Sequence, residues 1–471
     1  MSVFDAHRRI PIPIRAAAMN PGKNSGIVIF TSVIAALAGL LLGYDTGSVS
    51  GALGFISDTF HLDTIGKGGV VSMVLIGGIT GALVNGFLAD RLGRKITVQG
   101  AALLFIAGAA GSALSPTAGA LLASRFVLGF GLGAVSASAP LYIAEISPAA
   151  GRGRLVTYFQ LAITIGILLG YVVDRALTES GNWRLMLGTG ALPAFVLLIG
   201  MFVLPPSPRW LIKMGREDEA RETLIKITGG DTAIADAELN DIRKVLSMES
   251  DGGFADMLRS PVSRAFVTAI GLFLTQQFVG INSIMYYAPS LFRGAGMESP
   301  HSAILATVSV GVVNVLATFI AVWLIDRVGR KPLLYAGLVG MLVSLSAIGI
   351  IFALGDRGGY EIGRAAIIAV WFYIACFAFS LGPIPWIVMT EIFPLNVRGR
   401  AVSIATMSSW GSNLVVSFSF LPLLDAIGAS YTYWLYALVS LAGIVFVWRL
   451  VPETKGMTLE EIEERLLSGK K

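Results

Sequence analysis

The sequence contains very few of the side chains on which most enzyme active sites depend. There is one cysteine, Cys376, in 471 residues, and the three histidines lie outside the long apolar segments. One cysteine excludes an intrachain disulfide, and so few histidines leave neither a metal site nor a nucleophile with its base. We therefore expect a protein that is not an enzyme and has no metal or cofactor. We interpret Cys376 as a small buried side chain.

Charge is equally scarce, at 14% of the residues, whereas soluble domains carry about 25%. Hydrophobic residues make up 55% of the chain, and the mean hydropathy is +0.74. The 55 glycines suit close helix contacts in lipid. Although the pI is near 9.3, the basic residues lie in short loops between apolar stretches, which indicates membrane topology and no nucleic-acid binding. The composition predicts an all-α protein embedded in a lipid bilayer.

Twelve apolar stretches are long enough to span a bilayer, which takes about 20 residues. Most Lys and Arg lie in the tails and in alternate loops, so we expect both termini to be cytoplasmic. The stretches are 27–53, 66–89, 96–115, 118–144, 155–178, 183–204, 264–292, 302–325, 332–354, 364–390, 400–424 and 430–451.

Two motifs occur twice, in the same order, about half a chain apart. Asp-Arg-x-Gly-Arg-Lys stands at 90–95 and 326–331, and Glu-Ile-x-Pro stands at 145–148 and 391–394. Such a repeat indicates a duplicated membrane protein, and these are usually transporters. We expect six-helix halves at 27–204 and 264–451. A cytoplasmic linker at 205–263 should contain short amphipathic helices near 217–226 and 235–246. We expect cytoplasmic tails at 1–26 and 452–471, and a helix in the second tail after Thr458.

A carboxylate, Asp45, stands within the first apolar stretch, where an ionised side chain is costly. An apolar environment favours its protonated form and a nearby cation favours its ionised form. An Asp that alternates between the two would bind and release a proton, and Arg125 in the fourth stretch is the candidate cation. The alternative is a static ion pair that fixes the register of two helices.

Carboxamide side chains form a second polar group in the seventh stretch, at Gln276, Gln277 and Asn282. A regular helix with about 100° per residue would not direct all three at one ligand, so we expect the helix to unwind at Gly280. Gly382–Trp386, with two prolines, predicts a second break. Carboxamides together with a Trp face suit a neutral polyhydroxy compound. Polar residues of other stretches that could join the cavity are Gln160, Asn314, Trp410 and Asn413.

These motifs together resemble the sugar porter family of the major facilitator superfamily, and especially its bacterial proton-coupled members. The resemblance runs from Gly43-Tyr44-Asp45 to the Pro-Glu-Thr-Lys-Gly at 452–456 and includes the paired loops, Pro206–Leu211, Gln276–Asn282 and Gly382–Trp386. It implies a fold of twelve transmembrane helices in two pseudo-symmetric halves, a bacterial inner membrane, and symport of a sugar or polyol with a proton by alternating access. An oligomeric state is not specified, and a monomer is compatible with the sequence.

The resemblance also implies roles for individual residues. Proton coupling falls to Asp45, assisted by Arg125. Sugar contacts fall to Gln160, Gln276, Gln277, Asn282, Asn314, Trp386 and Trp410, with Asn413 in the same cavity. A cytoplasmic salt-bridge network that closes the inner side would comprise Asp90, Arg94, Glu145, Arg154, Asp326, Arg330, Glu391 and Arg400.

Three departures from the family pattern leave the substrate open. Ser409 stands where an amide commonly precedes the Trp, Leu42 replaces an aromatic side chain found in some relatives, and the segment at 205–209 lacks the usual Glu. A hexose, a pentose and an inositol all remain candidates. Two other functions also remain: a facilitative uniporter, which typically has a neutral residue in place of Asp45, and a sugar sensor, which the short C-terminal tail disfavours.

Overall fold

The computed structural model describes residues 25–147, 152–248, 262–294, 299–354, 359–393 and 395–453. Within these ranges all regular secondary structure is helical. The helices are α1 (Ser25–Phe60), α2 (Thr64–Leu92), α3 (Arg94–Leu114), α4 (Ala118–Ile146), α5 (Arg152–Leu177), α6 (Trp183–Gly188), α7 (Ala191–Val203), α8 (Pro208–Lys213), α9 (Glu217–Ile227), α10 (Thr232–Met248), α12 (Val262–Phe278), α13 (Ile281–Gly294), α14 (Pro300–Val328), α15 (Arg330–Leu354), α16 (Gly359–Phe379), α17 (Ile384–Ile392) and α18 (Leu395–Leu450).

Twelve spans can be traced through these helices. Eleven helical segments are long and apolar enough to cross a membrane. The longest of them, within α18, contains two spans because the backbone bends at Gly428, whose φ is 79°. Three spans consist of two shorter helices each, namely α6 with α7, α12 with α13, and α16 with α17. The predicted all-α membrane fold with twelve spans is therefore confirmed.

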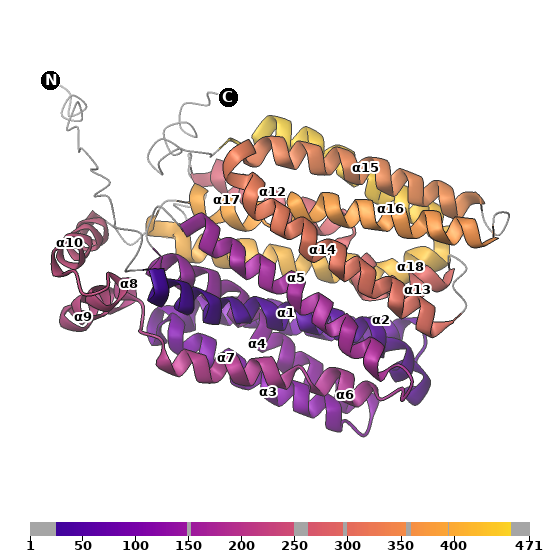
Figure 1. The fold of residues 1–471 in the computed structure, drawn as a ribbon, viewed down its shortest axis with the longest axis horizontal. Coiled ribbons are helices and arrows are strands. Elements are labelled where there is room, and N and C mark those ends of the chain that lie inside the picture. Colours follow the sequence, from indigo (N-terminus) through magenta and orange to yellow (C-terminus); the bar gives the residue numbers. More distant parts are fainter. Residues whose placement is uncertain are drawn as a thin grey trace.

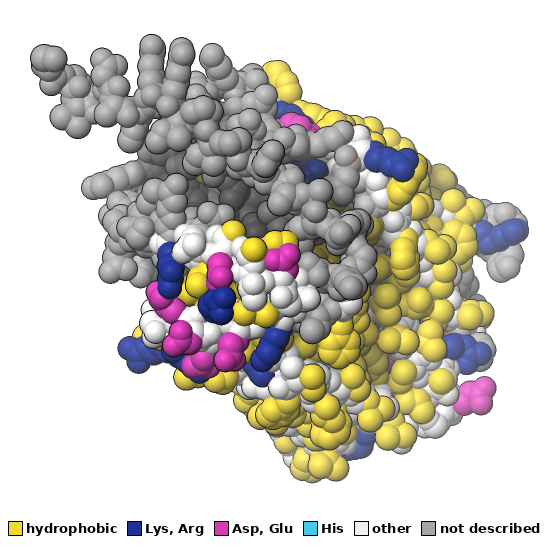
Figure 2. Space-filling model, turned by 60° about the vertical axis from the view of Figure 1, so that its left-hand side comes forward, with side chains coloured by type: hydrophobic (Ala, Val, Ile, Leu, Met, Phe, Trp, Pro, Cys, Tyr) yellow, Lys and Arg dark blue, Asp and Glu magenta, His cyan; other side chains and the backbone are white. Residues whose placement is uncertain are grey.

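The spans form two groups that lie side by side along their length (Figure 1). Helices α1 to α7 make one group and α12 to α18 the other, while α8, α9 and α10 lie beyond one end of the bundle. We call this end the linker end and the other the opposite end. Hydrophobic side chains cover the flank of the bundle seen in Figure 2, whereas charged side chains gather over the protruding linker helices. The flank is thus suited to lipid and the linker helices to water.

The linker helices α9 and α10 occupy the segments in which amphipathic helices were predicted. Their apolar faces share a small core with α8 that includes Trp210, Leu211 and Leu224. On the outside, Arg221 forms a bidentate pair with Asp236, with Nε to Oδ1 at 2.6 Å. This hydrogen bonding holds the pKa of Asp236 below its usual value. The predicted helix in the C-terminal tail lies outside the described residues.

Glycines set how closely the helices approach within the first group. α2 packs along α4, and a Cβ placed at Gly81 would come within 2.8 Å of the carbonyl carbon of Phe130. A rigid backbone could not move away as a flexible side chain could, so the close approach requires glycine. In contrast, a Cβ at Gly100 of α3 would meet no atom within 4 Å.

We expect Gly81→Ala to destabilise the protein, because the added methyl group has to push α2 away from α4. Overpacking of this kind costs about 1–3 kcal/mol. Gly100→Ala is the matched control, and it should leave stability unchanged or raise it by up to about 1 kcal/mol. Thermal unfolding of both purified variants in detergent tests the prediction, and equal melting temperatures would contradict it.

Candidate functional site

Asp45 and Arg125 meet within the first group of helices. Asp45 comes from α1 and Arg125 from α4, and the two Nη atoms of the guanidinium donate to the two carboxylate oxygens. The second of these hydrogen bonds, from Nη2 to Oδ2, measures 3.3 Å. Arg125 also donates from Nε to the carbonyl oxygen of Val70. Relative exposures of 1% for Arg125 and 5% for Asp45 mean that each charge depends on the other for its compensation.

A cavity of about 120 Å³ lies where the two groups of helices meet. Since about 10–15 Å³ of such space is the least that holds one water molecule, the cavity is large enough for several. Asp45 is its one charged lining side chain among the described residues. All eight predicted sugar-contact residues line this cavity, namely Gln160, Gln276, Gln277, Asn282, Asn314, Trp386, Trp410 and Asn413.

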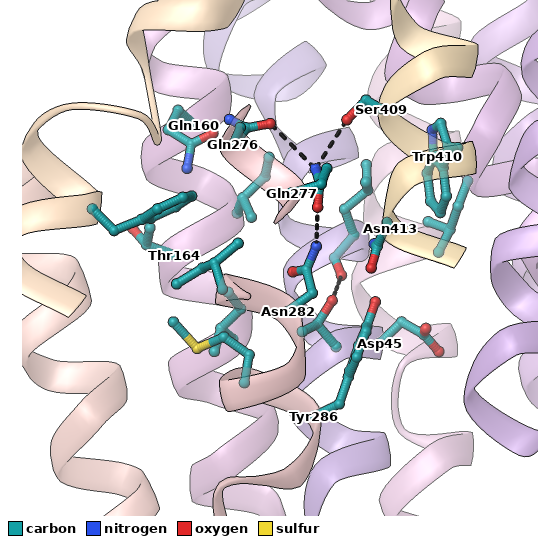
Figure 3. A pocket seen from close by; sticks show the side chains of 18 of the residues that line it. Asp45, Gln160, Thr164, Gln276, Gln277, Asn282, Tyr286, Ser409, Trp410 and Asn413 are labelled. Atoms are coloured by element: carbon teal, nitrogen blue, oxygen red, sulfur yellow. Dashed lines mark hydrogen bonds between the residues drawn. The ribbon is translucent and has the colours of Figure 1, made fainter. Parts of the chain in front are cut away.

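The three carboxamides of the seventh span form one continuous chain of hydrogen bonds (Figure 3). Asn282 Nδ2 donates to Gln277 Oε1 at 2.6 Å, and Gln277 Nε2 donates to Gln276 Oε1 at 3.2 Å. Gln277 Nε2 also donates to the hydroxyl of Ser409, at 3.0 Å. The chain fixes each amide's orientation, since swapping O and N in one of them would break its neighbours' bonds.

Gly280 makes this arrangement possible. Helix α12 ends at Phe278 and α13 begins at Ile281, and between them Gly280 has a φ of 86°, a conformation that favours glycine. The hydroxyl of Tyr373 donates to the freed carbonyl oxygen of Val279 at 2.8 Å. The expected break at Gly280 is therefore present, and it turns Asn282 toward Gln277.

A second break separates α16 from α17 at residues 380–383. Pro385 has no N–H to offer the carbonyl four residues earlier, that of Leu381. Gln276 Nε2 donates to this carbonyl oxygen at 2.6 Å. The carboxamide chain thus ends on the backbone of the broken tenth span, so the two breaks support each other.

The two cavity tryptophans differ in their surroundings. Trp386 contacts the rings of Phe159 and Phe273 edge to face, with centroid separations of 6.1 and 4.9 Å. Trp410, from α18, reaches across to the first group of helices, where its Nε1 donates to the hydroxyl of Ser136 at 3.1 Å. A Cβ at Gly78 would collide with this indole, so Trp410 also packs the two groups together.

Tyr286 was not among the predicted site residues, yet it lines the cavity on the side of the ion pair. Its hydroxyl lies close to Asn413, with Asp45 nearby (Figure 3), and it also interacts with Thr46. The side chain comes from α13, whereas Asp45 comes from α1. Tyr286 therefore places a hydroxyl of the second group near the ion pair of the first. The sequence signal was the Tyr286-Tyr287 pair, which an interfacial aromatic belt would also explain.

The described part of the predicted salt-bridge network lies at the linker end. Arg94 pairs through Nε with Glu145 at 3.1 Å and through Nη1 with Asp90 at 3.4 Å. Lys213 of α8 also pairs with Asp90, at 3.6 Å. These contacts join α2, α3, α4 and the linker within one group of helices. The side chains of Arg154, Asp326, Glu391 and Arg400 lie outside the described residues.

In the second group, Arg330 begins α15 at the position that Arg94 occupies in α3. Its backbone N–H and that of Lys331 donate to the two carboxylate oxygens of Glu453, at 3.0 and 2.9 Å. A carboxylate at a helix N-terminus satisfies free N–H groups and offsets the helix dipole. Sequence analysis gave no role to Glu453, because its partner is more than a hundred residues away.

Helices broken around a polar cavity, at the interface of two groups of six spans, define a multi-pass membrane transporter. The chain belongs to the sugar (and other) transporter family, which it matches over residues 31–466. This confirms the family indicated by the motifs and places the protein among transporters and not among enzymes.

Individual relatives match nearly the full length. The chain is 41% identical over 445 residues to the arabinose-proton symporter of Escherichia coli K12, covering 94% of both proteins. It is 40% identical over 449 residues to the galactose-proton symporter of the same strain, covering 95% of this chain and 96% of that one. The solved structure of the proton:xylose symporter XylE bound to 6-bromo-6-deoxy-D-glucose is similar with a TM-score of 0.83 at 33% identity, covering 94% of this chain and 99% of that one.

We expect Arg94→Gln to destabilise the linker end, because it leaves the largely buried carboxylate of Glu145 without its cation. Leaving such a group unpaired costs about 1–3 kcal/mol. Arg91 of the same motif lies over the ring of Phe87 at 4.0 Å and is exposed, so Arg91→Gln is the matched control. A lower melting temperature for Arg94→Gln alone is the expected result. An equal loss in both variants would mean that the Glu145 pair contributes nothing specific.

Proposed function

We propose that this protein is a secondary active transporter that carries a neutral sugar or polyol together with a proton. The observation that carries the proposal is the position of the buried Asp45–Arg125 pair, directly beside a cavity lined by carboxamides and tryptophans. One site thus combines a group able to take up a proton with groups able to bind hydroxyls. The names of the relatives, symporters of arabinose, galactose and xylose with protons, support the same function.

The chemistry of the cavity favours an uncharged substrate. Its polar lining consists of amides and hydroxyls, and the charge of Asp45 is already compensated by Arg125. Gln160, Asn314 and Asn413 have no charge to offer an ionic ligand, whereas each can both donate and accept hydrogen bonds to a sugar hydroxyl. Trp386 and Trp410 supply flat apolar faces for the C–H side of a ring. We infer a hexose, a pentose or an inositol as the substrate.

Ser409 stands out as a residue that affects the choice among these substrates. Its hydroxyl accepts the hydrogen bond from Gln277, so it orients that amide toward the cavity. A longer amide side chain at 409 would occupy space in the cavity that serine leaves open. Leu42, which also lines the cavity, presents an apolar wall where some relatives have an aromatic side chain.

Coupling follows from the dependence of the two buried charges on each other. While Asp45 is ionised, Arg125 is held against it and α1 is tied to α4. Protonation of Asp45 removes the attraction and frees Arg125 to find other partners. Tyr286, on the other group of helices, interacts electrostatically with Asp45, and this interaction would change on protonation. Proton binding would in this way alter the contact between the two groups.

Alternating access then needs the halves, residues 27–204 and 264–451, to rock about the cavity as bodies. We place the linker end and both termini in the bacterial cytoplasm, since the Lys and Arg of the loops favour that side. In this orientation the eight network residues, Asp90, Arg94, Glu145, Arg154, Asp326, Arg330, Glu391 and Arg400, would hold the cytoplasmic side closed while sugar and proton enter from outside. The linker helices would brace the same side through Lys213 and Asp90.

Asp45→Asn should separate transport from coupling. The amide keeps the shape of the side chain but has no charge to gain or lose, so we expect sugar exchange across the membrane to persist while accumulation driven by a proton gradient disappears. Exchange and accumulation of radiolabelled sugar in proteoliposomes measure the two activities. Asp58→Asn, an exposed position on the same helix, is the control and should retain both. An Asp45→Asn protein that still concentrates sugar would refute the coupling role.

Ser409→Ala should weaken sugar binding, because Gln277 loses one acceptor and its orientation becomes less defined. A lost hydrogen bond of this kind is worth about 0.5–1.5 kcal/mol, which corresponds to about a two- to tenfold rise in KM for exchange. The neighbouring Ser408 donates to the carbonyl of Ala405 in its own helix, so Ser408→Ala is the control. The same KM in both variants would show that Ser409 does not organise the site.

A further inference from the structure

A second carboxyl group, that of Asp174, is buried in the first group of helices, and the mechanism above does not use it. It lies on α5, and only 1% of its surface is exposed. α5 packs against α1 along glycines spaced four apart, namely Gly39, Gly43, Gly47 and Gly51. A Cβ at any of the first three would meet the backbone of α5, whereas at Gly51 it would meet the carboxyl group of Asp174. Asp174 therefore contacts the last of these four glycines, the one nearest the opposite end.

The hydrogen bonding of Asp174 does not suit an ionised carboxylate. Oδ2 accepts a hydrogen bond from the backbone N–H of Gly51 at 2.9 Å, while Oδ1 has no partner. None of the ion pairs among the described residues includes Asp174. A buried charge without a cation and with one oxygen unsatisfied is strongly disfavoured in a membrane bundle. This geometry fits a neutral carboxylic acid.

The ionisable groups that interact with Asp174 are tyrosines. They are Tyr44 on α1 and Tyr171 on its own helix, and both lie within electrostatic reach without a hydrogen bond to it. Helices α4, α6, α14 and α17 also pack against α5, but within the described part of the chain none of their cations forms an ion pair with Asp174. Asp45 lies six residues before Gly51 on α1, or roughly 9 Å along the helix axis. Asp174 is thus a separate acidic group, displaced from Asp45 toward the opposite end.

Contacts between the two groups of helices flank Asp174 on both sides. One turn deeper, the hydroxyl of Tyr171 donates to the carbonyl oxygen of Met285 in α13 at 3.0 Å. One turn nearer the opposite end, the guanidinium of Arg293, also from α13, lies 3.6 Å from the Cβ position of Gly54. Separation of the halves at this end would remove α13 from both places. Since Asp174 lies between these two contacts, their loss would open the region around it to water.

We propose that Asp174 is a second proton-binding residue of this transporter. It takes a proton from the outer solution when the halves part at the opposite end, with the proton adding to a carboxylate oxygen, and it is held neutral when they close. The inference rests on the proposed function, since it needs the halves to alternate.

The test uses exchange of radiolabelled sugar in proteoliposomes, measured at a series of external pH values. In the Asp45→Asn protein the first acidic group cannot titrate, so any remaining pH dependence comes from another group. We expect exchange by this variant to fall as the pH rises, by up to about tenfold per pH unit for a single site. Exchange by the Asp45→Asn/Asp174→Asn double variant should be independent of pH. Asp45→Asn/Asp58→Asn is the control and should behave like Asp45→Asn.

Two results would overturn the proposal: pH-independent exchange by Asp45→Asn, or a double variant that keeps the pH dependence. Either would mean that Asp174 has only a structural role between α5 and α1. Its replacement would then change the melting temperature but not the pH dependence of exchange. If the double variant fails to fold, Asp174→Ser, with a smaller neutral side chain, makes the same comparison. Failure of the proposed function is a distinct outcome, because an Asp45→Asn protein that still accumulates sugar contradicts that function whatever the pH profile of exchange.

Discussion

An ion pair buried in a membrane protein is tolerated when each charge compensates the other, and the contact between Asp45 and Arg125 meets this condition with two hydrogen bonds. Several helices of the first group form or support this contact. α1 and α4 supply the charges, and rows of glycine bring α1 close to the backbone of α5 and α2 close to that of α4. A change in the protonation of Asp45 would therefore alter the packing of several helices at once.

The second helix group differs from the first because two of its spans are broken beside the cavity. Gly280 and the Pro383–Pro385 segment interrupt two spans, and the amide of Gln276 satisfies the carbonyl that Pro385 leaves free. The breaks thus set the directions in which the amides point, as broken helices do at the substrate sites of transporters. Tyr286 of this group and Asp45 of the other both line the cavity, so the ion pair lies directly beside the polar site.

Local signals in the sequence were sufficient for much of this architecture. Apolar length predicted the twelve spans, glycine and proline predicted the breaks at Gly280 and Gly382–Trp386, and charge in an apolar stretch singled out Asp45 and Arg125. What could not be predicted depends on pairing across the chain. Glu453 caps a helix that begins more than a hundred residues earlier, and Asp174 looks like the end of an ordinary span until its position against Gly51 is known.

The central claim is that this cavity binds a neutral sugar or polyol and that the adjacent ion pair couples its movement to a proton. The most direct measurement is uptake of a panel of radiolabelled hexoses, pentoses and inositols into proteoliposomes, with and without an inward proton gradient. The account predicts that at least one member of the panel accumulates above equilibrium, and does so only with the gradient. Equilibration that is indifferent to the gradient would contradict it and leave Asp45–Arg125 a static ion pair in a uniporter.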